Sequence, residues 1–342
     1  MTTEDVDILK KGGDCHKSLA QSDLQQFHAG FSVAVLLPCY NEEHGISGVI
    51  AAFRQALPDA TIYVYDNNSK DKTVQIAQES GAVVRTESYQ GKGNVVRRMF
   101  SDIDADIYVM ADGDGTYDAA AAPELIQKLI ADNLDMVVGD REESDSKAYR
   151  HGHKFGNYFL TSMVKYLFGY GFTDILSGYR VMSRRFVKSF PIASSGFEIE
   201  TEMSVHALQL RLPVAEITTH YGTRPEESPS KLNTYRDGFR ILFAILGLLI
   251  SERPRLLFGT IAAILAAVSV IVAIPLLITY LQIGEVPRFP TAIFCVGTML
   301  LAAMTLGFGY LLHAETRARV EAKRLAYLSF KSVAGAQPPN VR

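Results

Sequence analysis

Short apolar runs alternate with longer stretches of helical spacing along residues 31–220. This alternation predicts buried strands joined by helices, which is typical of a mostly parallel α/β sheet covered on both faces. The expected strands are residues 33–37, 61–65, 82–85, 107–110, 136–138 and 213–220. The expected helices are residues 45–55, 73–79, 91–101, 123–133, 159–170 and 198–209.

Turn and cap residues set the expected boundaries of these elements. Pro38 is expected to stop the first strand, because proline cannot donate a ladder hydrogen bond. Asn41 is expected to cap the helix that follows. The stretch from Thr173 to Arg180 is expected to be a compact polar loop. Residues 1–30 are polar and weakly patterned, which predicts an N-terminal arm.

The C-terminal part is far more apolar. Residues 256–281 and 289–312 are each long enough to cross a membrane, and no ionisable residue lies inside either run. Residues 235–252 start with arginines and become apolar, which predicts a helix lying in the membrane interface. The sequence therefore predicts a two-helix membrane anchor. A buried hairpin of a soluble protein is the alternative.

The basic residues predict the orientation of this hairpin. Arginines precede the first span and a basic tail, residues 313–342, follows the second, whereas only Arg288 lies in the connection. The positive-inside rule then puts both ends in the cytosol. The N-terminus also lacks the pattern of a signal peptide. We therefore expect a multi-pass protein of the inner cell membrane, with residues 31–234 in the cytosol.

Composition narrows the class of partner. The chain of 342 residues has a formal net charge of −3, which gives no argument for nucleic-acid binding. Its three cysteines are far apart and form no metal-binding spacing, which suits a reducing compartment. The composition does not decide whether the protein forms a homo-oligomer.

The strand 107–110 leads directly into Asp112-Gly113-Asp114. In open α/β sheets, ligands gather at the carboxyl ends of the strands. Alternate residues of a strand face opposite sides, so Gly113 is expected to turn the chain and bring both carboxylates to one cation. Their hard oxygens suit Mg²⁺ or Mn²⁺, which proteins usually share with substrate phosphates. An Asp/Gly turn without a metal is the simpler alternative.

Other polar loops follow the neighbouring strands, which predicts one site built from several loops and able to hold a nucleotide. Asp66 could accept hydrogen bonds from a base or ribose, and the backbone from Pro38 to Tyr40 could frame the base. Lys92 could lie near phosphates, although its Gly-Lys-Gly turn is no P-loop. Asn67, taken alone, is expected to be only a turn former.

Glu198, Glu200 and Glu202 open a helix with more acidic charge than matching the helix dipole requires. One of them could act as a base or bind sugar hydroxyls. An ordinary charged helix start is the equal alternative.

Several segments, in this order, resemble the family 2 glycosyltransferases of the GT-A fold. They are VLLPCYNEE (35–43), YDNNSKD (65–71), DGD (112–114), GDR (139–141) and DILSGYR (174–180). Dolichol-phosphate mannose synthases and bacterial polyprenyl-phosphate glycosyltransferases are the most similar groups, over residues 31–234. The chain departs from them at Thr116, where mannose synthases often carry Gln, and at Asp66-Asn67-Asn68-Ser69, where Asp-Gly-Ser is usual.

The resemblance implies roles for matching positions. Asp112 and Asp114 would hold the divalent metal. Arg141 would join them in catalysis, close to the acceptor or the donor. The implied nucleotide-binding residues are Pro38, Tyr40, Glu42 and Asp66. The implied acceptor-phosphate contacts are Ser177, Arg180, Arg224 and Lys231.

The resemblance also implies the reaction, an inverting transfer of a hexose from a nucleotide sugar to polyprenyl or dolichyl phosphate. UDP-glucose or UDP-N-acetylglucosamine is favoured as the donor, and GDP-mannose is the second choice. One alternative is a hydroxyl acceptor on a glycolipid or polysaccharide, for which Glu200 or Glu202 would be the base. The chain has no Trp, so it lacks the Gln-x-x-Arg-Trp motif of processive synthases. A non-catalytic membrane scaffold is the other alternative.

Overall fold

The computed structural model describes residues 30–143, 172–196, 198–222 and 252–333, with a few single positions between these ranges. Its centre is a seven-stranded sheet in the order β3-β2-β1-β4-β6-β5-β7. The strands are β1 Val33–Cys39, β2 Thr61–Asp66, β3 Val83–Thr86, β4 Ile107–Met110, β5 Met136–Glu143, β6 Arg180–Ser183 and β7 Val214–Tyr221. The predicted α/β class is confirmed.

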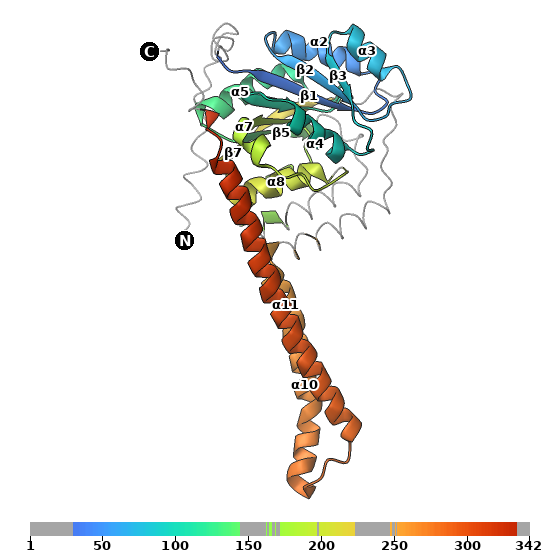
Figure 1. Cartoon of the computed structure of the whole chain (residues 1–342), viewed down its shortest axis with the longest axis vertical. Coiled ribbons are helices and arrows are strands. Elements are labelled where there is room, and N and C mark those ends of the chain that lie inside the picture. Colours follow the sequence, from blue (N-terminus) through green and yellow to red (C-terminus); the bar gives the residue numbers. More distant parts are fainter. Residues whose placement is uncertain are drawn as a thin grey trace.

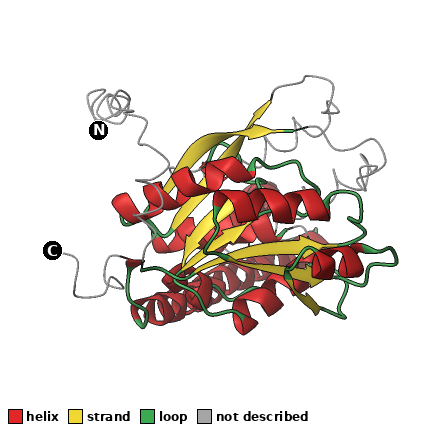
Figure 2. Cartoon of the chain, turned by 90° about the horizontal axis from the view of Figure 1, so that it is seen from above, coloured by secondary structure: helices red, strands yellow, loops and turns green. Residues whose placement is uncertain are grey.

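Helices cover both faces of this sheet (Figure 2). On one face, apolar side chains of α2 Ile46–Ala56, α3 Thr73–Glu79 and α5 Ala122–Ala131 form one buried cluster with the strands. On the other face, α4 Lys92–Asp102, α7 Arg184–Ser189 and α8 Ile199–Leu210 form a second cluster. A short 3-10 helix, η1 Ala119–Ala121, precedes α5. The two clusters form the core of the sheet-containing part of the chain.

Six of the strands run in one direction, and β6 runs antiparallel to both β4 and β5. The carboxyl ends of β1, β2, β4 and β5 therefore lie at one edge of the sheet, where β6 begins. Strand β6 and helix α7 were not predicted, because the four residues of β6 lie in a polar stretch of sequence that resembles a loop. The predicted convergence of the polar loops on one edge is confirmed.

Two predicted boundaries at the end of β1 are wrong. Pro38 lies inside β1 and pairs with Tyr65 of β2. The strand tolerates it because pairing with β4 ends at Leu36, so no ladder bond is lost on that side. Asn41 does not cap α2, whose N-cap residue is Gly45. Instead, Asn41 adopts a left-handed conformation with φ of 53°.

The C-terminal hairpin consists of α10 Pro254–Ile283 and α11 Phe289–Leu328, which lie side by side and project away from the sheet (Figure 1). Both are long and apolar enough to cross a membrane, because their most apolar stretches of 18 residues have mean hydropathies of 3.0 and 1.9. Only 11% and 17% of the residues in these two stretches are buried. Such exposed apolar surface favours a membrane hairpin over the core of a soluble protein.

Helix α11 continues well beyond the second predicted span, so residues 313–328 are helical rather than a tail. This extension packs on α7 and α8 (Figure 1). The Tyr327 hydroxyl donates to Oδ2 of the buried Asp135 at 2.8 Å, and Arg185 lies over the Tyr327 ring. Lys323 donates to Oε1 of Gln209 at 2.9 Å. Helix α11 is therefore joined directly to the part of the chain that contains the sheet.

Several predicted elements lie outside the described residues. These are the N-terminal arm up to residue 29, most of the helix 159–170 and most of the interfacial helix 235–252.

Candidate active site

Asp112 and Asp114 follow β4 at the edge where the polar loops meet. The carboxylate of Asp114 is buried, and its Oδ1 accepts hydrogen bonds from the backbone NH of Thr116 at 3.1 Å and its hydroxyl at 2.7 Å. The Asp112 side chain is 29% exposed. One carboxylate is thus fixed by the turn, and the other opens toward solvent.

Gly113 is needed between them for a different reason from the one expected. Gly115, with φ of 78°, is the left-handed glycine of this turn, and Gly113 is not among the residues with positive φ. A β-carbon on Gly113 would stand 2.5 Å from Sγ of Cys39. Lack of space, not backbone conformation, therefore requires glycine at position 113. Burial raises the pKa of the Cys39 thiol, and Glu42 and Asp112 raise it further.

Lys92, at the start of α4, joins the site from the neighbouring loop. Its Nζ lies 2.5 Å from Oδ1 of Asp112 and 2.5 Å from Oε1 of Glu200 on α8. Burial alone would lower the pKa of this ammonium, but the two carboxylates together raise it above its usual value. Lys92 is therefore a charged group held beside the predicted metal ligand.

The glycines on either side of Lys92 allow close approach of another backbone. A β-carbon at Gly91 or Gly93 would collide with the carbonyl oxygens of Ser195 and Ser194. Glu202 holds that second backbone in place, because its carboxylate accepts from the backbone NH groups of Ala193 and Ser194 at 2.9 Å each. Glu202 thus has a structural partner, and it shapes the loop against which Lys92 is packed.

The predicted nucleotide loops after β1 and β2 are linked to each other. The backbone NH of Asn41 donates to Oγ of Ser69, and the NH of Lys70 donates to Oδ1 of Asn41, both at 2.8 Å. The buried carboxylate of Asp66 accepts from the NH of Ser69 at 3.2 Å. These bonds bring Asp66 to the same edge as the remaining predicted nucleotide contacts, Pro38, Tyr40 and Glu42.

Asn67 does more than form a turn. Its buried amide donates to the carbonyl oxygens of Glu87 and Tyr89 at 3.0 and 2.8 Å. Its Oδ1 accepts from the backbone NH of Gly91 at 2.7 Å. Asn67 thus ties the loop after β2 to the turn that carries Lys92. The sequence marked this position only because Asp66-Asn67-Asn68-Ser69 replaces the usual Asp-Gly-Ser. The partners of Asn67 lie too far along the chain to be predicted.

Arg141 lies at the same edge, in a firm ion pair. Its Nε and Nη2 donate to the Asp174 carboxylate at 2.6 and 2.9 Å, and its guanidinium lies 5.5 Å from the centre of the Tyr221 ring. Tyr117, which was not predicted from the sequence, also lies at this site, beside Gly178. Its hydroxyl accepts from the backbone NH of Gly178 at 2.8 Å. Burial raises the pKa of Tyr117, and Asp112 raises it further.

Ser177 and Arg180 do not fit the acceptor contacts expected of them. Both are fully buried. The Ser177 hydroxyl donates to the carbonyl of Gly139 at 2.6 Å, and Arg180 donates to the carbonyls of Ser177 and Ile175 at 3.0 and 2.8 Å. Burial lowers the pKa of Arg180 to about 10. The prediction is wrong for these two residues, because their polar atoms brace the core.

Arg224 and Lys231 lie outside the described residues. The described chain stops nearby at Gly222, whose backbone NH donates to the carbonyl of Thr116 at 2.8 Å.

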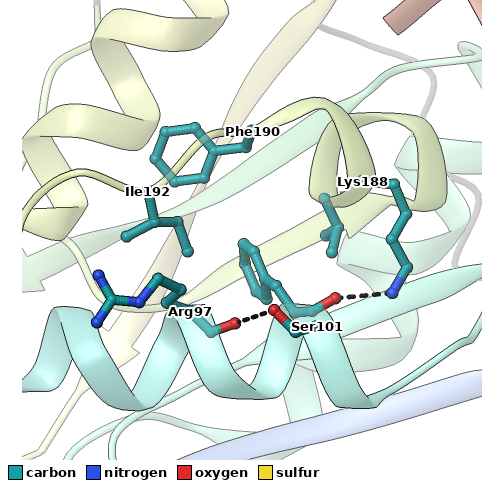
Figure 3. Close-up of a pocket in the computed structure, with 7 residues that line it drawn as sticks. Arg97, Ser101, Lys188, Phe190 and Ile192 are labelled. Carbon is teal, nitrogen blue, oxygen red and sulfur yellow. Dashed lines mark hydrogen bonds between the residues drawn. The ribbon is translucent and has the colours of Figure 1, made fainter. Parts of the chain in front are cut away.

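A separate pocket of about 240 Å³ lies between α4 and α7 (Figure 3). Its lining includes Arg97, Ser101, Lys188, Phe190 and Ile192. The Lys188 ammonium already has hydrogen-bond partners, because it donates to the carbonyl oxygens of Phe100 and Ile103 at 2.7 Å each. None of the predicted site residues lines this pocket, so we assign it no role in the reaction.

The donor set at the edge fits a hard divalent cation shared with a substrate. Within the described residues, no group of three or more His, Cys, Asp or Glu side chains could hold a metal alone. Mg²⁺ is usually bound by one or two carboxylates, with substrate phosphates and water completing its shell. Asp112 and Asp114 match that pattern.

Comparisons with known proteins agree with this arrangement. The sequence profile named Glycosyl transferase family 2 matches residues 34–190. Glycosyltransferase AglJ of Haloferax volcanii is 31% identical over 299 residues, covering 85% of this chain and 97% of the relative. A dolichyl-phosphate hexose transferase of the same organism is 27% identical, covering 66% of this chain and 96% of the relative.

Solved structures show the same fold. Glucosyl-3-phosphoglycerate synthase of Mycobacterium tuberculosis, in complex with Mn²⁺, UDP-glucose and phosphoglyceric acid, superposes with a TM-score of 0.54 at 22% identity. The match covers 68% of this chain and 86% of that chain. The same enzyme has been crystallised with Mg²⁺ and UDP. The sheet, the edge loops and these matches together show that the chain is a glycosyltransferase of family 2 with a GT-A catalytic fold.

Proposed function

We propose that this glycosyltransferase moves a hexose from a nucleotide sugar to the phosphate of a polyprenyl lipid, with inversion, at the cytosolic face of a membrane. We favour a phosphate acceptor because both carboxylates that could act as a general base already have partners in the structure. Glu200 is paired with Lys92, and Glu202 holds the backbone of Ala193 and Ser194. A hydroxyl acceptor would need one of them to take a proton.

A phosphate acceptor needs no such base. The second pKa of a phosphate monoester is about 6, so much of it is dianionic at neutral pH and can attack the anomeric carbon directly. The task of the protein is then to gather groups that repel each other. Arg141, directed by Asp174, would supply positive charge near the acceptor. Arg224 and Lys231 are proposed to add to it.

On the donor side, Asp112 and Asp114 would hold Mg²⁺ or Mn²⁺ together with the diphosphate. When bound, such a cation supplies positive charge to the departing nucleoside diphosphate. Lys92 would add a fixed ammonium next to it. Pro38, Tyr40, Glu42 and Asp66 would hold the nucleoside. Structural neighbours solved with UDP and with UDP-glucose support a uridine nucleotide. We therefore favour UDP-glucose or UDP-N-acetylglucosamine over GDP-mannose.

The hairpin supports a lipid acceptor. Since α11 runs from its apolar part to Tyr327 without interruption, a bilayer around the apolar part would hold the catalytic sheet at a set height above its surface. A relative is named for a dolichyl-phosphate substrate. The distribution of arginines supports a hairpin in the inner membrane, with the catalytic domain on the cytosolic side.

The test compares two acceptors that differ only in the phosphate. Purified full-length protein is supplied with a mixture of nucleotide sugars and either polyprenyl phosphate or the matching polyprenol, and lipid products are identified by mass spectrometry. We expect a hexosyl phosphate lipid from the first acceptor alone. Equal product from the alcohol would favour the hydroxyl-acceptor alternative. No product from polyprenyl phosphate with any donor would overturn the proposed acceptor.

A further inference from the structure

Lys92 has two carboxylate partners in different surroundings. Its Nζ lies 2.5 Å from an oxygen of each, Asp112 and Glu200. The Asp112 side chain is 29% exposed, whereas that of Glu200 is 5% exposed. The ammonium thus lies between one carboxylate that a ligand can reach and another that is enclosed by the domain.

This geometry creates a competition at Asp112, if the proposed metal role of that residue holds. Lys92 and a divalent cation would both seek the same carboxylate. An ammonium that lost its partner inside the protein would be strongly disfavoured. Glu200 removes this difficulty, because it stays paired with Lys92 after Asp112 turns to the metal. The carboxylates of Asp112, Asp114 and Glu200 with one ammonium leave two negative charges, which one divalent cation would neutralise.

Lys92 also has little room to leave. A β-carbon at Gly178 would stand 3.2 Å from its Nζ and 3.1 Å from Oδ2 of Asp112, so that backbone closes the site on one side. The carbonyls of Ser194 and Ser195 press against the glycines beside it. Its position is therefore set mainly by the two carboxylates.

We propose that Glu200 is a positioning residue, which retains Lys92 in the site while a divalent metal takes over the contact with Asp112. Without Glu200, the lysine pairs with Asp112 alone and opposes the metal. With Glu200, the lysine stays charged and near the diphosphate. Glu200 then acts through Lys92 and touches neither the metal nor the sugar.

A double-mutant cycle on metal affinity tests this, using Mn²⁺ with a fixed saturating concentration of UDP as the probe, because substrate phosphates are expected to complete the metal site. The full-length protein in detergent is titrated with Mn²⁺, free Mn²⁺ is followed by electron paramagnetic resonance, and the same titration without protein corrects for Mn²⁺ bound by UDP itself. We expect Glu200→Gln to weaken Mn²⁺ affinity about tenfold, and to change it less than about twofold when Lys92 is already Met. Lys92→Met alone should tighten binding. The matched control, Glu198→Gln, removes the same charge from an exposed position and should leave affinity unchanged.

An equal loss in both lysine backgrounds would overturn the inference, since Glu200 would then act on the metal by itself. If Glu200→Gln does not fold, Glu200→Asp is compared in the same two backgrounds, with the same coupling expected. A wild-type protein that binds no more Mn²⁺ than Asp114→Asn in the presence of UDP would instead remove the proposed metal site, and this inference with it. The two failures are thus distinguishable.

Discussion

The Sγ atom of Cys39 lies 2.5 Å from the point where a β-carbon on Gly113 would stand. Cys39 ends β1, and Gly113 separates the two aspartates that follow β4. The thiol therefore packs directly against the backbone between Asp112 and Asp114. The positions of both carboxylates depend on this contact between neighbouring strands.

A methyl group at position 113 should displace the aspartates. We expect Gly113→Ala to lower the transfer rate about a hundredfold, because a misplacement of about 1 Å can cost that much. The measurement is the transfer of labelled hexose to polyprenyl phosphate by purified protein. Removing the sulfur should restore the space, so the double variant Cys39→Ala/Gly113→Ala should recover most of the activity.

Cys39→Ala alone is the control for this pair, and we expect it to stay close to the wild type in activity. If the double variant is no more active than Gly113→Ala, the contact with Cys39 is not the reason for the glycine.

Metal removal should abolish transfer, and the loss should trace to Asp114. We expect a chelator to stop the reaction and added Mn²⁺ or Mg²⁺ to restore it in the wild type. Asp114→Asn keeps the shape of the side chain but removes its charge, so it should lose at least about a hundredfold even with excess metal. Asp132→Asn, which alters a surface pair with Lys128, should remain fully active. Unchanged activity of Asp114→Asn would contradict the metal assignment.

Much of the fold followed from local pattern, because central parallel strands such as β1 and β4 are runs of apolar residues. The predicted helix 73–79 matches α3 residue for residue, and strand 107–110 matches β4. Strand β6 could not be predicted, since its burial arises from pairing with β4 and β5 rather than from its own sequence.

Within the site, residue types were easier to predict than their partners. Arg180 has the charge of a phosphate ligand, but it is used to satisfy buried carbonyls. Glu200 was recognised as one of three carboxylates, yet its contact with Lys92 joins two helices far apart in sequence. Asn67 was predicted to be only a turn former, because its partners are 20 or more residues away in the sequence. Such assignments depend on tertiary contacts that no local pattern records.

The hydrogen bonds of Asn67, which brace the turn that carries Lys92, should affect binding of the nucleotide sugar. Asn67→Ala removes two donated bonds and leaves the carbonyls of Glu87 and Tyr89 without their partner, which should cost about 1–3 kcal/mol of stability. Because Gly91 also loses its acceptor, Lys92 should be less well placed, so KM for the nucleotide sugar should rise. Steady-state kinetics and thermal unfolding check both effects. Asn68→Gly is the control, since residue 68 has φ of 66° and its amide bonds are exposed. A KM change as large in Asn68→Gly would argue against the brace.

His206 should make the stability of the protein depend on pH. Its ring is buried between Phe186 and Phe190, and neither ring nitrogen has a hydrogen-bond partner among the described residues. Burial, together with the positive charge of Lys323, lowers its pKa from 6.5 to about 3. The unfolded chain therefore binds a proton below pH 6.5 that the folded chain does not, so stability falls with pH in the window from 6.5 to 3. At pH 5 this loss should be about 2 kcal/mol, judged from a shift of that size.

Replacing the imidazole with a ring that cannot titrate should remove this part of the pH dependence. We expect His206→Phe to lose less thermal stability than the wild type between pH 7.5 and pH 5, because the other titrating groups are shared. Tm measured across this range for both proteins gives the difference directly. His220→Gln changes an exposed histidine and should follow the wild-type curve. Parallel curves for wild type and His206→Phe would mean that His206 is protonated in the folded protein as readily as in the unfolded chain, contrary to its burial.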